Sequence, residues 1–350
     1  MPAAPDPRVA PGQIGFRAYL WQFKSAIVAA GVAEAAGIAG FGLGDGSIAL
    51  RVLAEPEAPT TRRLIAHEDA ALLCMAVAPD GQGFVSGGDD GRLMLTTAAG
   101  EGRLLAEVPR KWIEHVAVAD NGSAIAYSAG KHVGLLDGRG GVIAVLEDHP
   151  STVAGLAFNP KGKRLAAAHY GGVSLWWVKS EAQTPKRLSW KSSHVAVTWS
   201  PDGRFVMTGT QENEMHGWRL ADSADMRMSG YPSKPKSFSW SRDGRWLATG
   251  GADVVVVWDC KGKGPMGSRP EEVNQGALVT AVAFHPRHSL VASGHADGLI
   301  RLGRLADNSG TVLEQVGNGP ITALSWTSDG RYLLAGGEDG AAGILDFGTG

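Results

Sequence analysis

The sequence has few cysteines, no excess of basic residues and no uncharged apolar run long enough to cross a membrane. Only two of its 350 residues are Cys, which excludes a disulfide framework and makes a reducing compartment the expectation. The formal net charge of -2 argues against a dedicated nucleic-acid surface, which would normally be basic. A hydrophobic fraction of 44% is enough for a core and excludes global disorder.

The stretch from Ala26 to Gly44 resembles a membrane anchor in its composition. However, Glu34 interrupts it, and a carboxylate is costly within lipid. The stretch also fits the internal repeat described next, so we expect no membrane segment. Residues 1–15 are rich in Pro and Ala and are expected to form a flexible tail without a secretory signal.

What the chain does have is 49 Gly, about twice the usual share of roughly 7%. No Gly-X-Y period exists, so collagen is excluded. Self-comparison shows a block of about twenty residues that recurs every 40 to 45 residues. Eight copies begin at positions 27, 72, 113, 153, 194, 235, 279 and 321.

Each block has the pattern of a β-hairpin. In the last copy, residues 323–327 alternate between small or polar and apolar side chains, which predicts a strand with one buried face. Gly330 then supplies a turn, and residues 332–335 form a second apolar strand. A third strand fits 341–347 and a fourth fits between blocks. Four strands per repeat of this length are typical of a β-propeller blade.

The repeat resembles the WD40 family, on the evidence of Val256–Asp259, of Ser200–Gly203 and of Asp148 with His149 ahead of the fourth block. The resemblance covers about Phe16 to Phe347 and implies one all-β propeller domain over residues 16–350. We expect eight blades, with seven as the alternative. The family resemblance further implies that an N-terminal strand, 16–23, closes the ring by completing the last blade.

WD40 proteins often carry a buried hydrogen-bond network of His, Ser or Thr, Asp and Trp in each blade. The residues that match this motif are His67, Ser86, Asp90, His149, Thr249, Asp253, Trp258, Asp259, Ser293 and Asp297. We number the eight repeats as units one to eight in chain order, and no unit completes the set. Thr96 replaces the Trp of unit two, unit six has no His, and unit four pairs His149 with Trp177.

No catalytic constellation is visible. The chain has neither a Gly-x-Ser-x-Gly elbow nor a phosphate-binding loop followed by a helix. His285 and His288 have metal-ligand spacing, but no adjacent Cys, Asp or Glu offers a third ligand. We therefore expect no enzymatic activity, no metal and no cofactor.

The connections that enter the blocks carry basic and aromatic residues, and the turns between second and third strands carry acids. Both sets are expected on one face of the ring. The candidate partner-binding residues are Lys111, Trp112, Trp190, Lys191, Tyr231 and Lys234. The sequence thus favours a monomeric protein-interaction scaffold of the bacterial cytoplasm that binds neither nucleic acid nor membrane. The alternative is a propeller enzyme, or a binder of a metal or small ligand, that uses the central channel.

Aromatic rings at the sixth block position are expected to contribute more to stability than the incomplete polar networks. Burying such a ring contributes about 1.5–3 kcal/mol, whereas a partly satisfied network stabilises weakly. We predict that Trp240→Ala lowers the melting temperature more than His149→Ala, in melts followed by circular dichroism. A larger decrease for the His149 variant would contradict this ranking.

Overall fold

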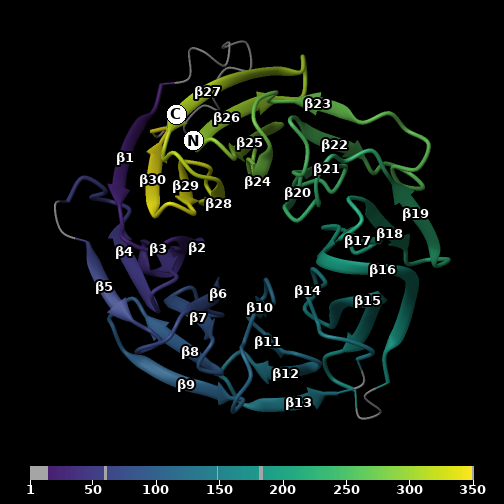
Figure 1. The fold of residues 1–350 in the computed structure, drawn as a ribbon, viewed down its shortest axis with the longest axis horizontal. Coiled ribbons are helices and arrows are strands. Elements are labelled where there is room, and N and C mark those ends of the chain that lie inside the picture. Colours follow the sequence, from purple (N-terminus) through teal and green to yellow (C-terminus); the bar gives the residue numbers. More distant parts are fainter. Residues whose placement is uncertain (1–14, 59–60, 148, 181–183, 349–350) are drawn as a thin grey trace.

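The computed structural model describes residues 15–58, 61–147, 149–180 and 184–348. These residues form β-strands and turns, together with one short 3-10 helix, η2 (Glu34–Ala36). The strands belong to seven antiparallel sheets arranged as a ring (Figure 1). Ala26 to Gly44, the stretch that resembles an anchor, forms two strands of the first sheet with η2 between them. Among the described residues, no helix combines the length and the apolar character that a membrane crossing requires.

Six sheets have four strands each, and the first strand of each repeat lies nearest the middle of the ring (Figure 1). The first three of these sheets contain β2 (Ile27–Ala33), β3 (Ile38–Leu43), β4 (Ser47–Val52) and β5 (Arg62–Ile65); β6 (Leu72–Val77), β7 (Gly83–Gly88), β8 (Arg92–Thr97) and β9 (Gly102–Glu107); and β10 (His115–Val118), β11 (Ala124–Ala129), β12 (His132–Asp137) and β13 (Val142–Leu146).

The other three four-stranded sheets follow the same order outward from the middle. They contain β20 (Phe238–Trp240), β21 (Trp246–Thr249), β22 (Val255–Asp259) and β23 (Glu271–Val273); β24 (Val279–Phe284), β25 (Leu290–His295), β26 (Leu299–Arg304) and β27 (Ser309–Gln315); and β28 (Ile321–Trp326), β29 (Tyr332–Gly337), β30 (Ala341–Asp346) and β1 (Arg17–Gln22).

The seventh sheet has six strands and contains the fourth and fifth repeats together. Its strands are β14 (Gly155–Phe158), β15 (Arg164–Trp177), β16 (Lys186–Trp199), β17 (Phe205–Thr210), β18 (Met215–Arg219) and β19 (Ala224–Met228). The first part of β16 pairs with β15, and the part from His194 onward pairs with β17. One continuous strand therefore replaces the loop that separates other units. Counted as hydrogen-bonded sheets, the propeller has seven blades, and the expectation of eight is corrected.

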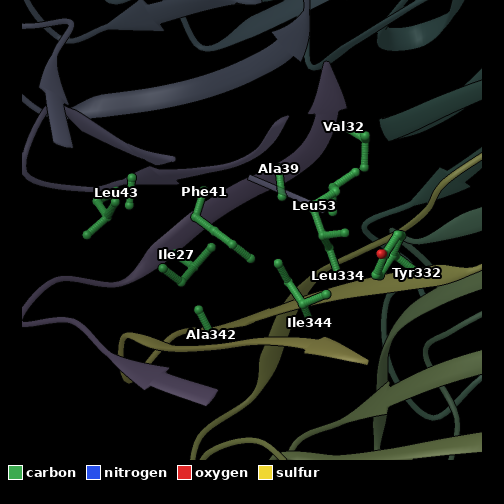
Figure 2. Close-up of a cluster of buried hydrophobic side chains, with 11 residues drawn as sticks. Ile27, Val32, Ala39, Phe41, Leu43, Leu53, Tyr332, Leu334, Ala342 and Ile344 are labelled. Atoms are coloured by element: carbon green, nitrogen blue, oxygen red, sulfur yellow. The ribbon is translucent and has the colours of Figure 1, made fainter. Parts of the chain in front are cut away.

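The contact between the first and last sheets joins the ring. β1 pairs with β30 from Arg17↔Asp346 to Gln22↔Ala341, as the outermost strand of the last sheet. The two sheets themselves meet through buried side chains, such as Phe41 from β3 and Ile344 from β30 (Figure 2). The expectation that strand 16–23 closes the ring is therefore corrected. The N-terminal strand extends the last sheet at its outer edge, and apolar packing joins that sheet to the first.

Glycine at the turns between second and third strands allows close packing on the face of the ring. Gly340 has a φ of +86°, and a Cβ at this position would lie 2.4 Å from the carbonyl oxygen of Phe23. Gly46 has a φ of +84°, with the carbonyl oxygen of His67 only 2.1 Å from its hypothetical Cβ. Such positions favour glycine both by conformation and by space. The turns and the connections between repeats therefore touch one another.

The packing between the first and last sheets predicts that truncating a buried side chain in this contact destabilises the protein more than truncating an exposed one on β1. Phe41 is 0% exposed within this contact, whereas Leu20 on β1 is 43% exposed. Phe41→Ala should lower the free energy of unfolding by about 3–5 kcal/mol, because it removes a buried ring and leaves a cavity. Leu20→Ala, the control, should lower it far less. Urea denaturation measures both, and equal losses would show that this contact does not hold the ring together.

Candidate functional site

The candidate site is the face of the ring formed by the connections between repeats and the turns between second and third strands. Backbone hydrogen bonds bring these two sets of loops together. The N–H of Ile113 donates to the carbonyl oxygen of Gly88 at 3.0 Å, and that of Val153 donates to Gly130 at 2.9 Å. Each of these connections is thus held by the turn of the preceding unit. We call this surface the connection face.

Lys111 and Trp112 lie on an exposed loop of the connection face, between β9 and β10. The Trp112 side chain is 59% exposed, which is unusual for an indole in a folded protein. Lys234 is also exposed, in the connection between β19 and β20. These three predicted residues are therefore available to a partner.

Trp190 and Lys191 lie within β16 rather than in a loop. The Trp190 ring stacks on His216, with ring centroids 4.0 Å apart and an interplanar angle of 17°. Its carbonyl oxygen is 3.2 Å from Nε2 of His194. Burial lowers the pKa of His216 to about 4, so the ring beneath Trp190 is neutral at pH 7. Lys191 is exposed, whereas Trp190 is half-buried and helps to pack the six-stranded sheet.

Tyr231 points into the core, where it completes the network of unit six. Its hydroxyl accepts a hydrogen bond from Nε1 of Trp258 at 2.7 Å and lies 2.8 Å from Oγ1 of Thr249. Burial raises the pKa of Tyr231 to about 12. Tyr231 thus takes the place in which the motif has His. The motif pattern does not predict this role, because it contains His and not Tyr at this place.

Unit two contains the most complete polar network. Nε2 of His67 lies 2.9 Å from Oγ of Ser86, and Nδ1 lies 3.1 Å from the carboxylate of Asp90. Ser, His and Asp in this order have the contacts of a hydrolase triad. However, Ser86 is 0% exposed and His67 is 1% exposed, so no substrate can reach this hydroxyl. The arrangement here stabilises the blade.

Unit four uses a different tryptophan from the one predicted. Nε1 of Trp176 donates to Nε2 of His149 at 3.0 Å, and Trp176 is 1% exposed. Trp177 is 52% exposed, with the Arg164 guanidinium 5.0 Å from its ring centroid. The register of β15 shifts between Tyr170 and Gly172. Trp176 lies in the same buried cluster as Leu165 and Ala167, whereas Trp177 lies at the surface, so the assignment to Trp177 is corrected.

The network of unit seven contains Ser293, as predicted, together with two residues that the sequence pattern did not assign to it. Oγ of Ser293 accepts a hydrogen bond from Nδ2 of Asn274 at 3.0 Å and lies 3.0 Å from Nε2 of His295. Asn274 therefore stands in the place of the missing His. Asp297 is exposed and accepts a hydrogen bond from the N–H of Leu299 at 3.2 Å.

The two Asp residues predicted for unit six lie outside its buried network. Asp253 is exposed. Asp259 forms an ion pair with Arg245 at 2.9 Å, and this pairing outweighs burial and lowers the pKa of Asp259. These residues help to shape the surface around the blade.

Some carboxylates of the connection face already accept hydrogen bonds from other residues of the fold. Burial would raise the pKa of Asp45, but hydrogen bonds from Ser47 and Arg63 outweigh it and lower the pKa. The backbone N–H groups of residues 318 and 319 donate to Asp339, whose pKa is also lowered. By contrast, the ammonium groups of Lys111, Lys191 and Lys234 have no carboxylate partner among the described residues. The face therefore presents unpaired positive charge beside acids of which some, such as Asp45 and Asp339, are hydrogen-bonded.

Within the described ranges, no group of three or more His, Cys, Asp or Glu side chains could hold a metal ion. His285 lies against the next unit, with Nε2 3.2 Å from the carbonyl oxygen of Gly330 and its ring 4.8 Å from that of Trp326. Burial lowers the pKa of His285 to about 4. The pair of histidines at 285 and 288 thus belongs to the packing between units.

Comparison with known proteins gives sequence matches to one described repeat family and to a curated protein. The family described as "WD domain, G-beta repeat" matches residues 59–96, 140–176, 226–259, 272–302 and 310–344, which together make half of the chain. The mouse "Periodic tryptophan protein 2 homolog" is 34% identical over 80 residues. That stretch spans 23% of this chain and 9% of the mouse protein.

Solved structures show the same fold. The chain is similar to a computationally designed protein, Ika8, with a TM-score of 0.74 and 20% identity over 93% of this chain and 97% of the designed one. It is also similar to U3-55K, with a TM-score of 0.61 and 18% identity over 81% of this chain and 98% of that one. At these identities the likeness concerns the fold alone.

The buried position of Tyr231 predicts a structural effect of its hydroxyl. Tyr231→Phe leaves the indole N–H of Trp258 without its acceptor, and an unsatisfied buried donor costs about 1–3 kcal/mol. We predict a lower free energy of unfolding in urea for this variant. Tyr170→Phe is the control, because Tyr170 is 53% exposed. An unchanged stability of Tyr231→Phe would show that the hydroxyl is not needed for the network.

Proposed function

Because this chain belongs to the WD40 repeat family, we propose that it is a non-catalytic scaffold that binds protein partners on its connection face. The observation that carries this proposal is the exposed Trp112 beside the unpaired Lys111. We further propose that it acts as a monomer in the bacterial cytoplasm, and that neither nucleic acid nor membrane is its partner. Its formal net charge of -2 supports a protein partner over nucleic acid.

The chemistry of the face supports protein recognition. Trp, Tyr and Arg dominate the binding energy of protein interfaces, and they do so where they can be desolvated by the partner. Trp112 offers a large apolar surface that the fold itself leaves uncovered. Lys111, Lys191 and Lys234 surround the same face without internal ion pairs, so they can complement acidic groups of a partner. The buried triad of unit two supports a non-catalytic role because its hydroxyl is inaccessible.

The test compares two combined variants of the full chain. The connection-face variant carries Lys111→Glu, Trp112→Ala, Lys191→Glu and Lys234→Glu. The control variant carries Lys161→Glu, Trp177→Ala, Arg242→Glu and Lys261→Glu, which are exposed residues of the opposite ends of the strands. Trp190 and Tyr231 stay unchanged in both, because each packs within the sheets.

Each tagged variant is purified from cells of the native host, and the co-purifying proteins are quantified by mass spectrometry. We predict that the connection-face variant recovers its partners at least about tenfold less than wild type, because it removes the anchoring side chains. The control variant should recover them as wild type does, with both variants folded by circular dichroism. Equal recovery by the connection-face variant would reject this face as the binding surface.

A further inference from the structure

The loop before Trp112 holds an arginine in a backbone conformation that arginine disfavours. The N–H of Lys111 donates to the carbonyl oxygen of Val108 at 3.2 Å, which closes a four-residue turn. Pro109 is its second residue, and Arg110, its third, has a φ of +62°. A turn with Pro at the second position and a positive φ at the third is normally occupied at the third by Gly or Asn.

Arg110 differs from the other residues of the described chain that share this conformation. The remaining non-glycine residues with positive φ are Asp69, Asn213, Ser223, Asn274 and Asn308. All five have short polar side chains, and Asn and Asp tolerate this region because they can hydrogen-bond locally. Arg110 has no side-chain hydrogen bond or ion pair within the described chain that would offset the strain. Strained residues of this kind cluster at functional sites.

The loop is held firmly by the turn between β7 and β8. The N–H of Val108 donates to the carbonyl oxygen of Gly91 at 2.8 Å, and Ile113 bonds to Gly88 on the other side. The carboxylates of that turn are already engaged: Asp89 accepts from the N–H of Ala71 at 2.8 Å, and Asp90 accepts from Arg92 at 2.9 Å. The backbone of the loop is thus fixed in place, and its cations form no ion pair among the described residues.

We infer that Arg110, Lys111 and Trp112 form one recognition element, and that it takes an acidic segment of a partner protein that carries an apolar side chain. This inference rests on the proposed function and names the chemistry of the partner. The two cations would bind carboxylates, and the Trp112 ring, 59% exposed, would cover the apolar side chain. The rigid backbone lowers the entropy that binding costs.

A peptide fits this element better than a nucleic acid does. Glu114 follows the loop directly, and Glu68 and Asp69 lie in the preceding connection, all three exposed. A nucleic acid carries one phosphate after another along its backbone, so it would meet these acids as well as the cations. A short protein segment can place its carboxylates on Arg110 and Lys111 alone.

The first experiment identifies what touches the loop. p-Benzoylphenylalanine replaces Trp112 in the full chain, in cells of the native host, and a second protein carries it in place of the exposed Trp177. We expect position 112, and not position 177, to crosslink a protein segment rich in Asp and Glu. A neutral or basic protein segment at 112 would overturn this inference while leaving the proposed function standing. Crosslinking to RNA, or no crosslink at 112, would overturn both.

The second experiment measures binding of a synthetic peptide with the crosslinked sequence by fluorescence anisotropy. Arg110→Asn should weaken peptide binding about tenfold. The melting temperature of this variant should equal or exceed that of wild type, because Asn tolerates the positive φ of the turn. Arg242→Asn, an exposed arginine on the opposite face, should change neither. A peptide with Gln in place of Glu should bind more weakly, and added salt should lower the affinity of the acidic peptide. Unchanged binding by Arg110→Asn would overturn the inference, and a lowered melting temperature would assign Arg110 a structural role.

Discussion

Each sheet of the ring must bury both of its faces against its neighbours, and the rest of the structure depends on this constraint. Strands such as β7, β11, β17 and β29 are buried along their whole length, because each lies inside a sheet that is covered on both sides. Apolar area buried in this way is the main source of stability of such a fold. The same packing joins the first sheet to the last, where Phe41 meets Ile344 (Figure 2).

The constraint also limits which parts of the fold can present a binding surface. The faces of the sheets are buried against neighbouring sheets, so mainly turns, connections and outer edges reach solvent. On the connection face, glycine turns let the connections approach closely, and backbone hydrogen bonds hold Val108 and Ile113 in place. A rigid frame of this kind can present a strained and exposed loop, such as Arg110–Trp112, at little cost to the fold.

Local patterns predicted much of this structure from the sequence. The repeat period, the turn glycines and the network of His67, Ser86 and Asp90 follow from residues close in the chain or fixed within one unit. The position of Trp176 could not be predicted in this way, because the pairing of β15 with β16 is irregular between Tyr170 and Gly172, and strand pairing decides which side chains face the core. Tyr231 and Asn274 were missed as network members because other residue types can provide the same hydrogen bonds.

The all-β repeat, its spacing and the composition of its loops are encoded locally, because alternation and turn chemistry act over a few residues. Three features instead depend on the folded ring: the fourth and fifth repeats share one sheet, Trp190 packs on His216, and Trp112 remains exposed. These outcomes depend on which strands pair and which surfaces meet across the ring. Such contacts are long-range, and their burial energies are realised only when all the sheets are in place.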